Sequence, residues 1–112
     1  MQRDDTVYLQ HIRDAITRME DYTRDIDEAA FKKQTLIQDG VIRQIEIIGE
    51  AVKRLSPSFR TSHDHIPWRD IARMRDKLIH DYFGVDVEKV WLTAKEDIPL
   101  LKAEVDRFLS SR

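Results

Sequence analysis

The chain of 112 residues contains no cysteine, only three glycines and three prolines, and no long hydrophobic run. The absence of cysteine excludes disulfide bonds, cysteine-ligated zinc and cysteine nucleophiles. No stretch approaches 18 consecutive apolar residues, and the charged N-terminus, residues 1–5, lacks the apolar run of a signal peptide. We therefore expect a soluble, cytoplasmic protein that does not bind a membrane.

The chain also lacks a large excess of charge of either sign. Its net charge is -2, although 36% of its residues are charged. Residues 53–77 depart from this balance, because they contain seven Lys or Arg residues but only three Asp residues. Either the ends of helices have simply collected cations, or these residues form a focused basic patch that holds a phosphate chain.

Alternation of apolar and polar residues typical of strands is absent, and helical periodicity runs through the whole chain. Aspartates at positions 4 and 5 can cap a first helix, and residues 27–34 form one or two helical turns. The apolar positions that define the long helices recur every three or four residues. They are Tyr8, Ile12, Ala15, Met19, Tyr22 and Ile26 in the first, and Ile37, Val41, Ile45, Ile48, Val52 and Leu55 in the second.

The other boundaries come from proline and glycine. Residues 56–67 read as an extended loop, Pro67 suits the first turn of a third helix over residues 68–83, and Gly84 ends that helix. A last helix spans residues 87–108, and Pro99 favours a kink near residues 95–98. Gly49, inside the second helix, indicates a close approach of another helix. The pattern predicts an all-α fold: an up-and-down bundle of four main helices plus one short helix, in a single domain over residues 1–112.

Two histidines of the predicted loop, His63 and His65, are one residue apart. Such a pair can bind a metal ion, but no further His or Cys pair supplies the remaining ligands, and loop histidines are commonly just solvated. We therefore expect neither a metal site nor a cofactor.

The third helix carries the chemistry of the chain, in Arg75, His80 and Tyr82. At 100° per residue, Arg75 falls near the middle of an apolar arc that starts at Trp68. A guanidinium in that position needs a partner, and Glu46 or Glu50 of the second helix can supply one. A purely structural ion pair is thus one interpretation of Arg75.

His80 falls instead on a polar arc with Arg69, Arg73 and Asp76. Asp76 precedes His80 by four residues, so its carboxylate can orient the imidazole and favour its charged form. An ordinary exposed histidine is the alternative.

Arg75 and His80 lie about 140° apart on a straight helix. Either the arginine curls round the groove edge toward the histidine, or a second copy of the helix completes a composite cleft. We expect the second arrangement, and hence a homodimer.

Four residues separate Arg75 from His80, and one residue separates His80 from Tyr82. This spacing resembles the signature of the HepT-like toxins, within the HEPN superfamily of all-helical nucleotide-binding and ribonuclease domains. Other stretches look like family positions too: residues 45–51, 66–68, 80–86 and 97–99, with Trp91. The resemblance extends over essentially the whole chain.

The resemblance implies a dimeric, metal-independent endoribonuclease, the toxin of a toxin and antitoxin pair. A minimal nucleotidyltransferase is the usual antitoxin partner and can adenylylate the signature tyrosine, here Tyr82. In this chain Arg75 would stabilise charge on the scissile phosphate, and His80 would act as general acid or base during attack by the RNA 2′-hydroxyl.

Several expectations come from the residues themselves. Asp76 would orient His80, while Arg69, Arg73 and Lys77 would bind RNA. A histidine acting without a metal suits RNA rather than DNA, because RNA carries its own nucleophile. Tyr82 lies seven residues from Arg75 on the same stripe, so an adenylyl group there would block the phosphate site.

Two other hypotheses remain at this stage. The chain could be a non-catalytic nucleotide-binding or partner-binding subunit of a minimal nucleotidyltransferase, with Tyr82 as acceptor, or a purely structural helical dimer.

Overall fold

The computed structural model describes residues 3–80 and 86–111, apart from the side chains of residues 3, 75 and 77–80. The described residues form helices and no strand, which confirms the predicted all-α class. The elements are α1 (Arg3–Thr23), α2 (Glu28–Lys33), α3 (Thr35–Arg54), α4 (Pro57–Ser62), α5 (Trp68–His80), α6 (Val87–Leu92), the π-helical segment η1 (Thr93–Asp97) and α7 (Ile98–Ser110).

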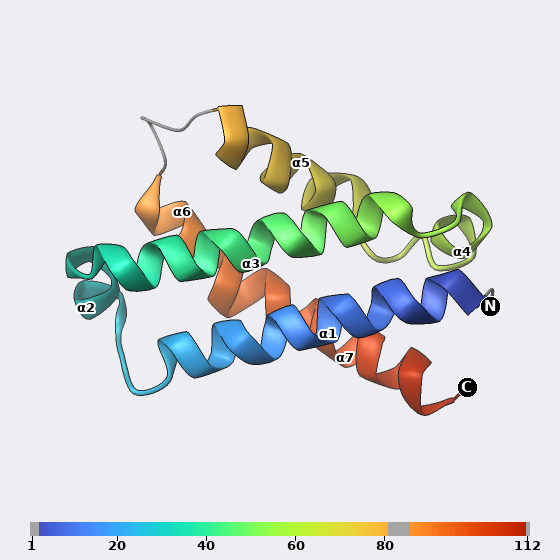
Figure 1. Cartoon of the computed structure of the whole chain (residues 1–112), viewed down its shortest axis with the longest axis horizontal. Helices are drawn as coiled ribbons and strands as arrows, with labels where there is room; N and C mark the ends of the chain where they lie inside the picture. Colours follow the sequence, from blue (N-terminus) through green and yellow to red (C-terminus); the bar gives the residue numbers. More distant parts are fainter. Residues whose placement is uncertain (1–2, 81–85, 112) are drawn as a thin grey trace.

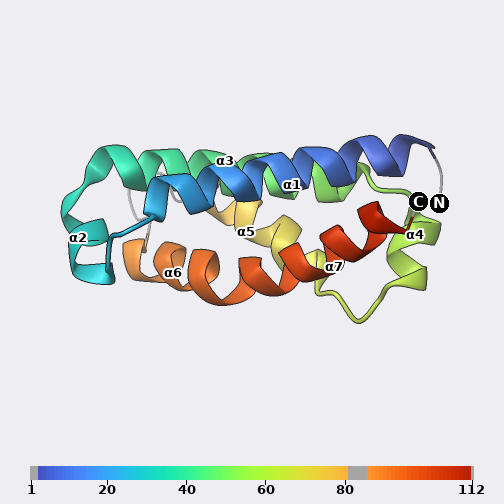
Figure 2. The ribbon, with the colours of Figure 1, turned by 90° about the horizontal axis from the view of Figure 1, so that it is seen from below.

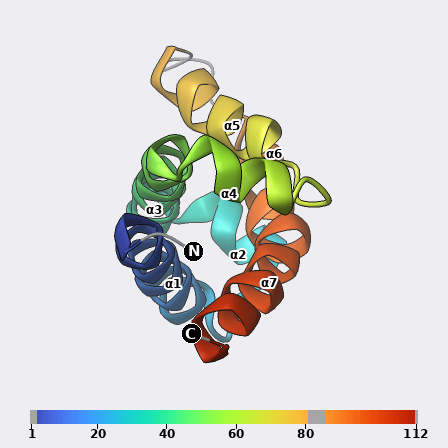
Figure 3. The same ribbon diagram turned by 90° about the vertical axis from the view of Figure 1, so that its right-hand side faces the viewer.

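Four long helical arms build the molecule. In Figure 1, α1 and α3 run side by side, and α5 lies on the other side of α3 from α1. Figure 2 shows α6, η1 and α7 as one continuous arm that crosses beneath this layer. In the end view of Figure 3, α1, α3 and this arm surround the core, whereas α5 projects outside it. The helix that carries the motif is therefore a peripheral element.

The hydrophobic core lies where α1, α3 and the α6–α7 arm meet. Most of the apolar positions predicted from the periodicity are buried there. Of the predicted positions, those that are fully enclosed are Ile12, Met19, Val41, Ile48, Val52, Leu55 and Val105. Four further side chains that the periodicity did not single out are enclosed with them: Leu9, Ile16, Phe31 and Val90. Ion pairs then join the arms at the rim, with Arg13 Nε 2.5 Å from Asp106 Oδ1 and Lys102 Nζ 2.7 Å from Glu20 Oε2. Burial fixes the position of α3, and α3 in turn carries α5.

The start of the first helix differs from the prediction that Asp4 or Asp5 caps it. Helix α1 begins at Arg3, so both aspartates lie inside its first turn. Asp5 is only 2% exposed, and its two carboxylate oxygens accept hydrogen bonds from the backbone N–H and the hydroxyl of Ser56, at 2.7 and 2.8 Å. The carboxylate therefore joins α1 to the junction of α3 and α4 instead of capping its own helix.

The predicted loop over residues 56–67 is wrong in its first half, because α4 occupies Pro57–Ser62. Ser56 is the N-cap and accepts a hydrogen bond from the Phe59 N–H at 3.2 Å. Pro57 takes the first helical position, where its missing N–H costs nothing. The sequence signal of this helix start is a capping serine followed by proline, a pair that also interrupts helices. By contrast, the short helix predicted over residues 27–34 is confirmed as α2.

Where Pro99 predicts a kink near residues 95–98, the structure has the π-helical segment η1 at Thr93–Asp97. Pro99 has no N–H to donate to the carbonyl four residues earlier. The chain adjusts by widening one turn, so that the Ile98 N–H donates to the Thr93 carbonyl, five residues back. Among the described residues, no helix is long and apolar enough to cross a membrane. The single-domain assignment stays a prediction.

Candidate functional site

The N-terminal half of α5 is held firmly, and this half positions the motif. Trp68 is 6% exposed, and its indole Nε1 donates a hydrogen bond to the His63 carbonyl at 3.0 Å. Ile71, Ala72 and Met74 are partly buried against the core, as the predicted apolar arc requires. The rotation of α5 about its own axis is thereby set before the chain reaches Arg75.

The central residues of the motif lie at the edge of what the structure describes. Arg75 and His80 are within α5, as predicted, and so is Lys77. The side chains of these three residues, and all of Tyr82, lie outside the described residues. Their roles, including the expected pairing of Arg75 with Glu46 or Glu50, therefore stay predictions.

Within the motif segment from Arg75 to His80, the side chain that the structure describes is that of Asp76, and it contacts α3. Its Oδ1 atom is 2.6 Å from Lys53 Nζ, with both side chains partly exposed. The sequence places Lys53 in the basic segment but does not reveal this contact, because the two residues are 23 positions apart. This ion pair fixes the middle of α5 to α3. Whether Asp76 also orients His80 stays a prediction.

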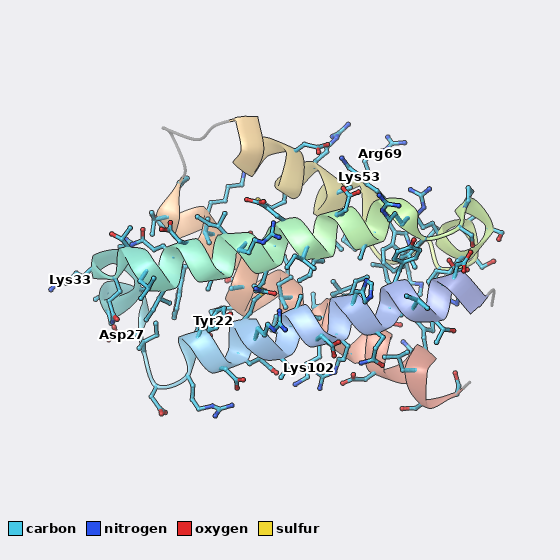
Figure 4. All side chains as sticks on the ribbon, viewed as in Figure 1. Tyr22, Asp27, Lys33, Lys53, Arg69 and Lys102 are labelled. Carbon is cyan, nitrogen blue, oxygen red and sulfur yellow. The ribbon has the colours of Figure 1, made fainter. Side chains whose placement is uncertain are left out.

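Basic side chains do gather beside the motif helix. Arg69 and Arg73, predicted to bind RNA, are exposed on α5, one turn apart. Figure 4 shows Lys53 and Arg69 on the same side of the molecule, where α3 and α5 lie next to each other. The three cations come from two helices, and together we call them the basic face. Exposed guanidinium and ammonium groups on one side can hold the phosphates of a nucleic acid.

The two glutamates expected near Arg75 have other contacts on α3. Glu46 Oε2 is 3.8 Å from Arg43 Nη1, and Glu50 Oε1 is 3.3 Å from Arg54 Nε. Tyr8 of α1 also contributes, because a hydrogen bond to its phenol, and then the one to Glu50, raises the pKa of Arg54 above its ordinary value. The α1 side of α3 thus carries two glutamates between two arginines, in the order Arg43, Glu46, Glu50 and Arg54.

A cavity lies on the opposite side of α3, toward the α6–α7 arm. This cavity has a volume of about 430 Å³, and its walls are mainly apolar, including Ile48, Ile71, Met74 and Leu101. Leu100 stands at the same place and is 72% exposed. The outward position of α5 therefore leaves apolar surface uncovered next to the motif helix.

The two loop histidines have structural partners. His63 packs between Phe59 and Phe108, and its Nδ1 lies 2.9 Å from the Phe59 carbonyl. His65 Nε2 is 3.2 Å from Glu104 Oε2. That hydrogen bond, followed by the ion pair with Arg107, lowers the pKa of Glu104 even though burial opposes the shift. No group of three His, Cys, Asp or Glu side chains among the described residues is placed to hold a metal ion.

Comparison with known proteins gives a consistent result. The family model described as "Ribonuclease HepT-like" matches residues 12–108. A Thermococcus cleftensis protein named "Probable ribonuclease HepT" is 50% identical over 107 residues, which cover 96% of this chain and 97% of that protein. A "Putative RNase" of Caldanaerobacter subterraneus is 41% identical over 102 residues, 91% of each chain.

One similar protein is longer. A Methanocaldococcus jannaschii protein named "Gamma-glutamylcyclotransferase and putative RNase" is 50% identical over 105 residues, which cover 94% of this chain but 47% of that protein. The chain thus spans about half the length of this relative. No solved structure matches the chain.

Proposed function

The protein belongs to the ribonuclease HepT-like family, and we therefore propose that it is a metal-independent endoribonuclease. The observation that carries the proposal is the helix α5, which holds the backbone of Arg75 and His80 beside the exposed cations Arg69 and Arg73. The basic face would hold the RNA backbone while the two motif residues act on one phosphodiester. Relatives named as ribonucleases, similar along nearly their whole length, support the same reaction.

The proposed reaction uses the nucleophile of the substrate. The RNA 2′-hydroxyl oxygen attacks the adjacent phosphorus, and the bond from phosphorus to the 5′-oxygen breaks. His80 carries out one of the two proton transfers and water the other: the 2′-hydroxyl proton is removed, and the leaving 5′-oxygen is protonated. Arg75 stabilises the negative charge that builds up on the phosphate oxygens. The products are a 2′,3′-cyclic phosphate and a 5′-hydroxyl end.

The first experiment tests cleavage directly. The full chain is incubated with RNA in excess EDTA, and we expect products that end in 2′,3′-cyclic phosphate. An RNA with a 2′-deoxy sugar at the cleaved position should resist. His80→Ala and Arg75→Ala should each lower the rate by about 10²-fold or more. Arg107→Ala is the matched control, because Arg107 lies outside the motif and is 65% exposed.

Cleavage retained by His80→Ala would refute the catalytic assignment. Cleavage that disappears in EDTA and returns with a divalent cation would refute metal independence. A wild-type chain that binds nucleotides but never cuts RNA would favour the non-catalytic subunit instead.

The proposal includes a homodimer, in which each cleft takes Arg75 from one protomer and His80 from the other. It is supported by the separation of about 140° between these residues around a helix, and by the apolar surface beside α5 with its exposed Leu100. A second copy would cover that surface and bring the two halves of the motif together.

Mixing two inactive variants tests the composite cleft. Arg75→Ala and His80→Ala chains, unfolded together and refolded, should form mixed dimers with one intact cleft, and recover up to about a quarter of wild-type activity. Each variant refolded alone is the control. No recovery, in a mixture whose light scattering shows dimers, would contradict a shared cleft.

We further propose that the protein is the toxin of a toxin and antitoxin pair, with a minimal nucleotidyltransferase as antitoxin that adenylylates Tyr82. The position of Tyr82, seven residues after Arg75, supports inhibition by a phosphate and base placed over the phosphate site. Mass spectrometry after coexpression should find the adenylyl group on the wild type and not on Tyr82→Phe. Modified protein that still binds and cuts RNA would refute this mechanism.

A further inference from the structure

The α1 side of α3 carries a groove that the proposed mechanism does not use. It has a volume of about 360 Å³ and lies open to solvent. Helix α1 contributes Tyr8 and His11, and α3 contributes Arg43, Glu46, Glu50 and Arg54. We call these six residues the α1–α3 groove. A hollow of this size that combines aromatic, cationic and anionic side chains is unlike the apolar cavity on the other side of α3.

The α1 wall of the groove is aromatic. The rings of Tyr8 and His11 meet edge to face, with centroids 5.9 Å apart and an interplanar angle of 84°. Tyr8 is partly buried and so is fixed in position, whereas His11 is exposed. Because the two ring planes are nearly perpendicular, an unpaired nucleobase can stack on only one of them, and Tyr8 is the ring that partial burial holds in position.

The α3 wall supplies hydrogen-bond donors at both ends of the groove. Arg43 and Arg54 are 11 positions apart, which places them on one face of α3, about 16 Å from each other along its axis. Arg43 contacts Glu46 through Nη1 alone, at 3.8 Å, and Arg54 contacts Glu50 through Nε. A guanidinium has five N–H donors, so most of them remain for other acceptors. The two carboxylates between them are acceptors for the N–H groups of a base.

The groove lies close to the motif helix. Lys53, next to Arg54 in sequence, holds Asp76 of α5 at 2.6 Å. One helix, α3, therefore has the groove along one side and α5 along the other, as the arrangement of α1, α3 and α5 in Figure 1 shows. A strand held on the basic face needs to cross only the width of α3, about 10 Å, to enter the groove.

We propose that the α1–α3 groove binds one unpaired nucleobase and the adjoining phosphates of the RNA substrate, on the strand that flanks the cleaved bond. This inference rests on the proposed ribonuclease function and names its substrate class, single-stranded RNA. The base stacks on Tyr8, contacts the neighbouring His11 ring at its edge, and donates hydrogen bonds to Glu46 or Glu50. Arg43 and Arg54 contact the phosphates on either side.

Binding is measured apart from cleavage, with the full chain carrying His80→Ala, in EDTA. The probe is a fluorescein-labelled, unstructured RNA of about ten nucleotides. Loss of one stacking surface should weaken binding by about 5- to 150-fold in Tyr8→Ala, while Tyr8→Phe, which keeps the ring, should stay within about twofold. Tyr22→Ala is the matched control, because Tyr22 is an exposed tyrosine on the same helix outside the groove.

Two further variants keep the test independent of folding. His11 is exposed, so His11→Ala should fold normally and still bind the RNA several-fold more weakly. Arg43→Gln should reduce the salt dependence of binding by about 0.7 in log–log slope, the value for one contact with a single strand. Arg107→Gln, which also removes an exposed arginine paired to a glutamate three residues away, should leave the slope unchanged.

The outcomes separate the inference from the proposed function. Equal affinities for Tyr8→Ala, His11→Ala and Tyr22→Ala would overturn the groove as a binding site, even if the protein cuts RNA. Equal binding of single-stranded RNA and its duplex would overturn it as well, because a paired base cannot enter. Failure of the wild-type chain to cleave would refute the ribonuclease function, whereas binding that depends on Tyr8 and His11 would support the groove regardless.

Discussion

Replacing Asp5 should destabilise the fold more than replacing any exposed charge, although Asp5 lies in the first turn of the chain. Its carboxylate is 2% exposed and accepts two hydrogen bonds from Ser56, at 2.7 and 2.8 Å. The Ser56 hydroxyl in turn accepts from the Phe59 N–H and begins α4. One carboxylate thus holds together α1, the end of α3 and the start of α4.

The size of the effect follows from those two bonds. A hydrogen bond to a charged group contributes about 1.5–3 kcal/mol, and a buried donor left without a partner carries a further penalty. Asp5→Ala should therefore lower the free energy of unfolding by about 3–5 kcal/mol, a large part of the total of about 5–15 kcal/mol for a domain. Asp5→Asn keeps one acceptor oxygen and should lose about half as much.

Chemical denaturation followed by far-ultraviolet circular dichroism measures these changes. Asp4→Ala is the matched control, because Asp4 is exposed in the same turn, and it should cost less than about 0.5 kcal/mol. A double-mutant cycle with Ser56→Ala should give a coupling energy of about 1–2 kcal/mol between the carboxylate and the hydroxyl. The reasoning is refuted if Asp5→Ala and Asp4→Ala unfold at the same denaturant concentration.

Three other changes should be measurable. The pKa of Glu104 is lowered from 4.5 by His65 and then Arg107, so the ionised carboxylate stabilises the fold above that pH and loses this effect on acidification. In Glu104→Gln the free energy of unfolding should therefore fall less steeply below about pH 4.5. The same steepness in wild type and variant would contradict this. Gly40→Ala places a Cβ 3.2 Å from the exposed Tyr22 ring, and this ring can shift to make room. Thermal unfolding should therefore show that the protein gains up to about 1 kcal/mol in stability. A loss of stability would show that the ring is fixed. For the half-exposed pair of Lys53 and Asp76, a double-mutant cycle at low salt should give about 0.2–1 kcal/mol, and a coupling that persists in high salt would mean that the pair is shielded from solvent.

Helical periodicity was enough to predict the long helices and most of the core. A residue such as Ile48 or Val105 repeats every three or four positions because one face of its helix is buried, so the pattern and the structure have the same cause. A disturbance of the helix before Pro99 could be predicted as well, since proline lacks an N–H wherever it lies, but the expectation was a kink and the structure has a widened π-helical turn. Predictions of this kind hold in the folded protein because they depend only on residues that are neighbours in the sequence.

The errors concern side chains whose partners are distant in sequence. Asp5 was expected to cap its own helix because a capping bond is local, but Ser56, 51 residues away, offers two donors inside the core. Lys53 and Asp76 are 23 residues apart and likewise gave no sequence signal. The α4 helix shows a different limit, because Ser56 and Pro57 start a helix with the same residue types that also interrupt one.

The same distinction between local patterns and contacts of distant residues applies to the candidate site. The arc that carries Trp68, Ile71 and Met74 could be read from periodicity, so the orientation of α5 on α3 was predictable from the sequence. The groove between α1 and α3 was not, because Tyr8 and Arg54 meet only after both helices have packed. Helix α3 is the element that links the two surfaces: Lys53 holds α5 on one side, and Arg54 faces Tyr8 on the other. A substrate strand that spans both must cross α3, so variants at Lys53 should affect RNA bound at either surface, whereas variants at Tyr8 should affect only the groove.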